Sequence, residues 1–368
     1  MNQVLMAIMA AGAVVGGIDR ILGNKWGYGA KFEEGFQFLG STALSMAGMI
    51  CLAPVLADVL GKIIVPIYRM IGVDPGMFGS LLAIDMGGYQ LAKELAADAQ
   101  IGSYAGIVAA SIFGCTVVFT IPVGMGMIPE KDRDCFAKGV MVGLVTIPVG
   151  LVVGGGLAGL SVPACIRQNL PVLVLALLLL LGLWKIPSGM IRGFCVFAKG
   201  IRCVITVGLV LGAVEYMCGI QLLKGMTPLT EAMEVVAAIG IVMLGSLPVV
   251  EFLQRILRKP FCVLGKRAGM NPAGITGLLV GAVSAIPAIS MYKDMDERGK
   301  IVNAAFLVSA ASMLSAHMGF TLSTEPELLG ALIGAKLSGG AAAVLVAFVV
   351  SGNRAGTESV EVERNCAV

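Results

Sequence analysis

Three long stretches without a charged residue constrain this chain more than any other feature. They run over residues 101–129, 139–166 and 268–292. A helix needs about 20 predominantly apolar residues to cross a bilayer, and each stretch is longer than that. Only 13% of all residues are charged, against roughly 25% in soluble domains. The chain is therefore predicted to be an all-α polytopic membrane protein.

Eleven apolar windows divide into two kinds. Two of them, 75–92 and 271–292, begin at an Asp-Pro or Asn-Pro dipeptide and are broken again inside, the first by Gly87-Gly88 and the second by Pro287. We predict broken or re-entrant segments there. The plain windows are expected to span the membrane, which gives nine crossings, or eleven if the broken segments cross as well. The plain windows are 1–18, 35–57, 101–128, 139–160, 168–184, 203–223, 235–253, 301–323 and 330–350.

The chain also matches itself at an offset of about 197 residues. The sequence GVDP at 72–75 aligns with GMNP at 269–272, and Gly23 aligns with Gly219. Transporters are commonly built from two such repeats, with the substrate bound near the midplane where discontinuous helices meet. The predicted organisation is listed by residue ranges: 1–167 a first membrane repeat, 168–200 a linking helix and cytoplasmic loop, 201–350 a second membrane repeat, and 351–368 a polar tail.

The distribution of basic residues predicts the orientation. Lysines and arginines gather at 185–202 and at 255–267, and such segments stay in the cytoplasm. The turn with Glu325 and Glu327 has neither residue type and is predicted to lie outside. With nine crossings the two repeats are inverted and with eleven they are parallel; the inverted arrangement is favoured.

Other motifs exclude several functions. The nine cysteines form no C-x-x-C pair, so neither a disulfide framework nor a metal site is predicted. A single histidine among dispersed cysteines provides no catalytic pair, so we expect no enzyme and no cofactor. No basic run with interleaved aromatics occurs, which argues against a nucleic-acid partner. The GxxxG spacing at Gly12–Gly16 and Gly139–Gly143 instead predicts close helix packing in lipid.

Asp85 is the strongest candidate for function. An aspartate at the centre of a membrane helix costs about 2.5–3.5 kcal/mol and is therefore expected to face a partner or a polar cavity. Gly87 and Gly88 would let backbone carbonyls turn toward that cavity, and Tyr89 offers a ring face to a cation. Each of these residues also has a structural interpretation. Asp85 could form an ion pair with Lys93 or Arg69. The two glycines could be a notch for helix packing, and Tyr89 could be an aromatic anchor at the membrane interface.

Six further residues are weaker candidates. Asn271, Ser284 and Ser290 in the second broken segment could accept a ligand hydroxyl. Asp19 and Glu215, at matching repeat positions, could form an acidic pair, although a salt bridge of Asp19 with the adjacent arginine is favoured. His317, the only histidine, could carry a proton or simply bond to a neighbouring helix.

Three stretches of the sequence resemble one known family. They are GGIDRILGNKWGYGAKFEEGF, SMAGMICLAPVLADVLGKIIVPIYRMIGVDP and LLAIDMGGYQLAKELA, and together they are similar to the bacterial ethanolamine transporter (EutH) family of the ethanolamine-utilisation pathway. The resemblance implies a multi-pass protein of the bacterial inner membrane that brings ethanolamine through the lipid bilayer. It supplies no established binding residues.

The resemblance and the residue chemistry agree. Ethanolamine carries an ammonium group, and removing that group from water calls for a carboxylate, carbonyl oxygens or an aromatic face. Asp85, Gly87-Gly88 and Tyr89 supply all three. A passive channel for ethanolamine and a transporter of another small amine stay open as alternatives, as do the energy source and a homo-oligomeric state. An anion transporter would need a cationic residue in 75–92 or 271–292, and neither contains lysine or arginine.

Replacing Asp85 with asparagine tests this hypothesis. The change keeps the shape and removes the charge, so a desolvated ammonium loses a charged hydrogen bond worth about 1.5–3 kcal/mol. The apparent affinity for ethanolamine should fall about ten- to hundredfold, because 1.4 kcal/mol corresponds to one decade. Uptake of labelled ethanolamine, normalised to the amount of protein in the membrane, measures it. Unchanged affinity at normal expression would make Asp85 structural.

Overall fold

A computed structural model describes residues 2–82 and 88–352, and within those ranges the regular structure is entirely helical. The predicted all-α class is thus confirmed. The elements up to the middle of the chain are α1 (Asn2–Ile21), α2 (Tyr28–Thr42), η1 (Ala43–Ala47), α3 (Gly48–Met70), η2 (Pro75–Leu81), α4 (Gly88–Leu95), α5 (Ala99–Tyr104), η3 (Ala105–Gly114), η4 (Thr116–Thr120), α6 (Ile121–Met127), η5 (Glu130–Asp132), α7 (Arg133–Leu157), α8 (Val162–Gln168) and α9 (Leu170–Lys185). The later elements are α10 (Pro187–Cys218), α11 (Leu229–Ala268), α12 (Pro272–Val283), α13 (Ala285–Ser290), η6 (Tyr292–Asp294), α14 (Glu297–Ala310), α15 (Ala316–Thr324), η7 (Pro326–Leu328) and α16 (Leu329–Val350).

The number of continuous spanning helices differs from the expectation. In the described part of the chain six helices are long and apolar enough to cross a membrane, or seven if α8 and α9, bent by 56°, form one span. The predicted windows 1–18 and 301–323 are not among them. The second window is divided between α14 and α15, neither of which is long enough alone. The six are Tyr28–Met70, Ala99–Met127, Glu130–Leu157, Arg192–Cys218, Leu229–Leu257 and Pro326–Val350.

Each broken segment starts in the same way. Gly72 and Gly269 follow the ends of α3 and α11 with φ of +67° and +65°, a left-handed conformation that glycine adopts at little cost. Two residues later Asp74 and Asn271 cap the next helix, since each side chain accepts a backbone N–H at 2.8 Å. A proline follows at the first helical position, where its missing N–H is harmless. The motif Gly-x-Asp/Asn-Pro therefore ends one helix and starts another.

The internal break of the second segment lies at Ser284, three residues before the predicted Pro287. Ser284 is extended, with φ of −151° and ψ of 130°, and Pro287 lies inside α13. Proline has no N–H for the carbonyl four residues earlier and its ring collides with it. That carbonyl belongs to Val283, so the helix ends there, and the Ser315 hydroxyl donates to the Val283 oxygen instead.

A second break divides the window 301–323. Helix α14 ends at Ala310 and α15 begins at Ala316, with Ser312 between them at φ of +54°. The backbone N–H groups of Ser312 and Leu314 donate to the carbonyls of Gly281 and Ala282, at 3.0 and 2.8 Å. The break between α14 and α15 is thus hydrogen-bonded to the break between α12 and α13.

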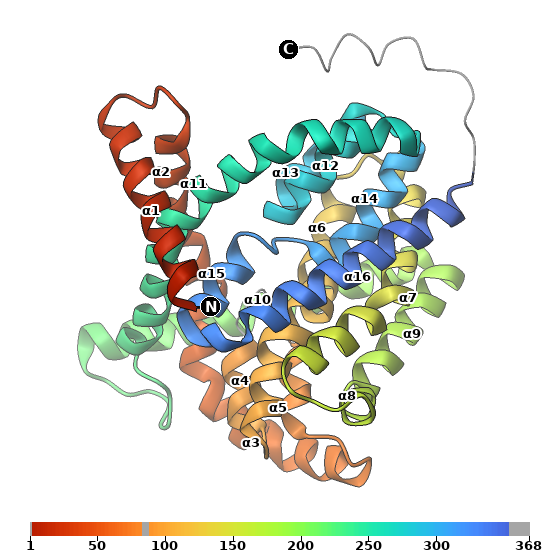
Figure 1. The fold of residues 1–368 in the computed structure, drawn as a ribbon. Helices are drawn as coiled ribbons and strands as arrows, with labels where there is room; N and C mark the ends of the chain where they lie inside the picture. The colour runs from red at the N-terminus through yellow and green to blue at the C-terminus, as the bar shows by residue number, and fades with distance from the viewer. Residues whose placement is uncertain (1, 83–87, 353–368) are drawn as a thin grey trace.

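Glycines bring pairs of helices into backbone contact. A Cβ on Gly143 of α7 would lie 2.5 Å from the Val308 Cβ of α14, and one on Gly12 of α1 would lie 2.4 Å from the Gly245 carbonyl of α11. Both glycines belong to predicted GxxxG pairs, and both helix contacts are close, as expected. In Figure 1, α1 and α2 form a hairpin beside α11, while α7, α14 and α16 pack together on the other side of the molecule.

Both segments predicted as cytoplasmic loops are helical. Residues 187–202 form the first half of α10, and residues 255–267 lie within α11. Lysine and arginine are good helix formers, so a basic segment can be helical. The point at which a sequence becomes less hydrophobic marks the end of an apolar window, but the helix can continue beyond it. The predicted linker, 168–200, is therefore built from helix α9 and the start of α10.

The elements follow one another in the same order in the two predicted repeats. A capped broken segment, η2–α4 or α12–α13, is followed by an irregular helix and then by one long regular helix, α7 or α16. Gly23 and Gly219, aligned in the sequence, both follow a helix end at positive φ. In Figure 1, α4 lies in the lower part of the molecule and α12–α13 in the upper part beneath α11. The inverted orientation of the repeats stays a prediction.

Replacing Gly143 with alanine should destabilise the protein. The added Cβ would meet the Val308 side chain at 2.5 Å and the Ala305 carbonyl at 2.8 Å, and such overpacking costs about 1–3 kcal/mol. Thermal unfolding of the purified protein in detergent measures the loss. Gly156→Ala in the same helix is the control, because a Cβ there meets nothing within 4 Å. Equal unfolding temperatures for the two variants would contradict the close contact.

Candidate functional site

The first predicted site residues fall at the start of α4. Asp85 and Gly87 lie outside the described residues, whereas Gly88 and Tyr89 begin α4. The Tyr89 side chain points into the protein and is 9% exposed. Its hydroxyl donates a hydrogen bond of 2.7 Å to the Glu325 carboxylate, which follows directly after α15. Residues more than two hundred positions apart in the sequence thus meet here.

Glu325 is the centre of a polar cluster. Besides the Tyr89 hydroxyl, its carboxylate accepts the Lys93 ammonium at 2.8 Å and the Ser103 hydroxyl at 3.0 Å. All three donors reach the same oxygen, Oε1. We call Tyr89, Lys93, Ser103, Phe320 and Glu325 the Glu325 cluster.

The Glu325 cluster holds an alkylammonium ion between a carboxylate and an aromatic ring. Tyr89 and Lys93 lie four residues apart on α4 and so share one face of the helix. The Lys93 ammonium lies 5.4 Å from the centre of the Tyr89 ring, within the range of a cation–π contact. Phe320 of α15 supports the ring edge-on, with ring centres 5.3 Å apart. The Lys93 side chain is 39% exposed, so its head group can be reached from solvent.

The same contacts set the charge of the cluster. Burial by itself raises the pKa of the Glu325 carboxyl, but hydrogen bonds from Lys93, Tyr89 and Ser103 outweigh it and hold this pKa below the usual value of 4.5. The hydrogen bond to Glu325 in turn raises the pKa of Lys93. Glu325 is therefore an anion and Lys93 a cation at neutral pH.

His317 lies in a second polar region, at the start of α15. It is 1% exposed, and its Nδ1 is 3.2 Å from the Ala311 carbonyl. The same carbonyl accepts the ammonium of Lys336 at 3.0 Å. Lys336, on α16, was not among the predicted residues. A single lysine in the apolar window 330–350 was the signal that could have identified it, because ionisable groups inside a membrane are functional by default.

The three polar candidates of the second broken segment do not share one site. Asn271 caps α12 and donates its amide to the Asp294 carbonyl at 2.8 Å, so its side chain is already occupied. Ser284 lies at the break between α12 and α13. Ser290 is exposed and donates back to the Ile286 carbonyl. Only Ser284 is near the broken backbone at which a ligand is expected.

The proposed acidic pair is absent. Asp19 is fully buried and accepts the backbone N–H groups of Trp26 and Gly29, at 2.9 and 2.8 Å, while Glu215 accepts the side chain of Gln221. The favoured alternative, a salt bridge of Asp19 with the adjacent arginine, is wrong as well. The buried Asp19 carboxylate accepts hydrogen bonds from backbone N–H groups at the turn before α2. These bonds compensate for its burial better than a hydrogen bond from the exposed guanidinium of Arg20 could. These contacts favour a structural role for Asp19 at the turn between α1 and α2.

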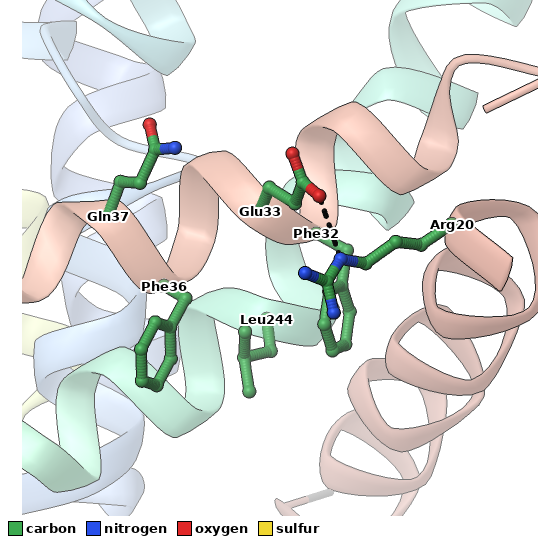
Figure 2. A pocket seen from close by; sticks show the side chains of 6 residues that line it. All are labelled: Arg20, Phe32, Glu33, Phe36, Gln37 and Leu244. Atoms are coloured by element: carbon green, nitrogen blue, oxygen red, sulfur yellow. Dashed lines mark hydrogen bonds and ion pairs between the residues drawn. The ribbon is translucent and has the colours of Figure 1, made fainter. Parts of the chain in front are cut away.

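A hollow of about 540 Å³ lies apart from both polar regions. It is formed by α1, α2 and α11, and the Arg20–Glu33 ion pair, with a distance of 2.7 Å, crosses one side of it (Figure 2). Members of the Glu325 cluster do not line it. Its lining residues are Arg20, Phe32, Glu33, Phe36, Gln37 and Leu244. It contains no carboxylate free of a basic partner, so it lacks the chemistry predicted for the substrate site.

Comparison with known proteins gives one consistent result. The sequence model of the family described as "Ethanolamine utilisation protein, EutH" matches residues 1–350. A protein of Listeria monocytogenes named "Probable ethanolamine permease EutH" is 45% identical, over 94% of this chain and 93% of its own length. A protein of Salmonella typhimurium with the same name is 40% identical, over 95% of each chain. An uncharacterised Bacillus subtilis protein, YxeR, is 39% identical over 94% of each chain. No solved structure matches.

The lowered pKa of Glu325 predicts how its contribution to stability depends on pH. In the unfolded chain the carboxyl titrates near 4.5, whereas in the folded protein its pKa is lower. Ionised Glu325 therefore stabilises the fold fully above pH 4.5, and this contribution is lost as the pH falls through the lower, folded-state pKa. Wild type should unfold at a higher temperature than Glu325→Gln above pH 4.5, and the difference should disappear in more acidic buffer. A difference that grows with acidity would contradict the sign of the shift.

Proposed function

The chain belongs to the EutH family of ethanolamine utilisation proteins, and from this membership together with the Glu325 cluster we propose that it is a permease that carries ethanolamine across the bacterial inner membrane. A multi-pass membrane protein whose relatives are named ethanolamine permeases is a transporter and not an enzyme. The expected resemblance is confirmed by the family match. The substrate of this chain, the membrane and the site are the proposal.

The position of the Lys93 ammonium is the observation that best supports the Glu325 cluster as the substrate site. A carboxylate oxygen at 2.8 Å and an aromatic ring centre at 5.4 Å surround it. Ethanolamine presents the same chemical group, an ammonium on a methylene chain. The Glu325 cluster is therefore already built to bind the charged end of such a substrate, with Lys93 occupying the place.

Exchange of one ammonium for another is the proposed first step. An incoming substrate displaces Lys93 from Glu325, so the carboxylate never faces the apolar surroundings without a cation. The Ser103 hydroxyl, 3.0 Å from the same carboxylate oxygen, can bind the substrate's hydroxyl end. The basic-residue pattern predicts that Glu325 lies on the outer side of the membrane, which makes this an entry site. Asp85, four residues before Tyr89, remains the sequence-based candidate for the next carboxylate.

A passive channel for ethanolamine is the second candidate mechanism. The two can be separated with purified protein in liposomes, by loading unlabelled ethanolamine inside and measuring entry of the labelled compound. A carrier returns faster when loaded and so accelerates the exchange, whereas a channel does not. The break between α12 and α13 is hydrogen-bonded to the break between α14 and α15. This arrangement favours a carrier, since discontinuous helices form the binding sites of carriers.

If the substrate displaces Lys93 from Glu325, substitutions of these two residues should affect the half-saturation concentration of ethanolamine differently. Glu325→Gln removes the charge that holds the substrate and should raise the half-saturation concentration of ethanolamine about ten- to hundredfold. Lys93→Gln removes the competing ammonium and should leave that concentration unchanged or lower it. Glu327→Gln, an exposed carboxylate of the same turn, is the control and should behave as wild type. Uptake of labelled ethanolamine into liposomes measures all three.

Parallel losses in the Glu325 and Lys93 variants would contradict the exchange step. A purely structural ion pair predicts that result, because either substitution breaks the same bridge. Protein content of the liposomes and thermal unfolding of each variant must therefore be measured alongside uptake.

A further inference from the structure

Lys336 is buried near the middle of the apolar helix Pro326–Val350, with an exposed fraction of 0%. Its ammonium donates to the carbonyls of Ser111, Ala311 and Ser309, at 2.9, 3.0 and 3.3 Å. Burying an ammonium costs several kcal/mol unless good hydrogen bonds compensate. The three carbonyls therefore form a site whose chemistry suits a single positive charge.

These carbonyls come from irregular backbone. Ser111 lies in the π-helical stretch Ala105–Gly114, while Ser309 and Ala311 lie where α14 ends. The last carbonyls of a helix have no N–H partner within the helix and are free to turn toward a cation. In membrane transporters, unwound carbonyls of this kind hold the coupling sodium ion or proton.

The site has more polar atoms than the lysine uses. The Ser309 hydroxyl oxygen and the His317 Nε2 are both buried, and within the described part of the chain neither has a hydrogen-bond partner. Both residues belong to the site, because Ser309 contributes a carbonyl to Lys336 and the other nitrogen of His317 faces the Ala311 carbonyl. Purely structural polar groups are nearly always paired when buried. The Ser309 hydroxyl and the His317 Nε2 are therefore polar atoms beside Lys336 that a further small polar species could contact.

The cation is also connected to the second broken segment. Ser312 and Leu314, directly after the Ala311 carbonyl, donate to the carbonyls of Gly281 and Ala282. The backbone that follows Ala311 is thereby hydrogen-bonded to the end of α12, next to the break at Ser284. The site around Lys336 therefore adjoins both discontinuous helices of the second half of the chain.

We propose that the carbonyl oxygens around Lys336 form a monovalent-cation site that the protein fills with its own ammonium group, so that transport needs no sodium ion. This inference rests on the proposed transport function. The lysine head group takes the place that a coupling ion has in a sodium-dependent carrier. Because it is covalently attached, it holds the break between α14 and α15 together in every buffer.

Removal of the lysine should convert the site into one that binds a free cation. We expect Lys336→Ala to unfold at a lower temperature than wild type in N-methylglucamine chloride. Sodium or potassium chloride at equal ionic strength should raise the unfolding temperature of this variant by about 2 °C or more, as a bound ligand does. Wild type should show no such difference between the salts. Lys62→Ala, at a lysine whose side chain is 73% exposed, controls for general salt effects.

A second variant covers the case in which Lys336→Ala does not fold. Lys336→Ser also removes the ammonium and leaves the space between the carbonyls open, while its hydroxyl returns one polar group to the site, so it should show the same preference for sodium or potassium. Absence of a cation-dependent shift in a folded Ala or Ser variant would overturn the proposal. So would wild-type ethanolamine uptake that requires a sodium gradient, a measurement that needs no variant at all. If wild type moves no ethanolamine, the proposed function fails, while the unfolding measurements still decide the cation site.

Discussion

The need to satisfy every backbone polar group away from water governs this structure. Lipid offers no hydrogen bonds, so a helix interrupted within a membrane needs another partner for each freed N–H group and each freed carbonyl. Here a different group meets that need at each interruption. Asp74 and Asn271 cap helix starts, the Ser315 hydroxyl reaches the Val283 carbonyl, and the Lys336 ammonium reaches three carbonyls at once. Each of these polar side chains is thereby placed where the regular helices stop, which is where a polar solute can be received.

Local signals in the sequence predicted much of the fold and little of the site. The Gly-x-Asp/Asn-Pro motif was sufficient to locate both capped breaks. Its glycine adopts a positive φ and its Asp or Asn side chain accepts a nearby backbone N–H, and both properties depend only on neighbouring residues. The break at Ser284 was placed at Pro287 instead, since a proline disturbs the preceding turn more than its own position. The contact between Tyr89 and Glu325 could not be predicted, because it depends on tertiary packing of α4 against the end of α15 and has no pattern within either segment.

The two lysines hold their ammonium groups with different oxygen chemistry. Lys93 faces an ionised carboxylate in a partly exposed position, so its contact is sensitive to charge and to salt. Lys336 donates to three backbone carbonyls in a buried position, where salt has little access. One ammonium thus contacts a carboxylate in a partly exposed position, and the other contacts backbone carbonyls in a buried one.

The glycine contacts between helices have a mechanical consequence. Where Gly143 meets α14 and Gly12 meets α11, backbone touches side chain or backbone with no flexible layer between them. Close-packed surfaces of this kind cannot slide past each other in small steps, because any shift creates either an overlap or a void. Helices α7 and α14 therefore behave as one stiff unit, and α1 and α11 as another. Changes of shape are therefore expected where helices meet through longer side chains, which can change rotamer, and not at these glycine contacts.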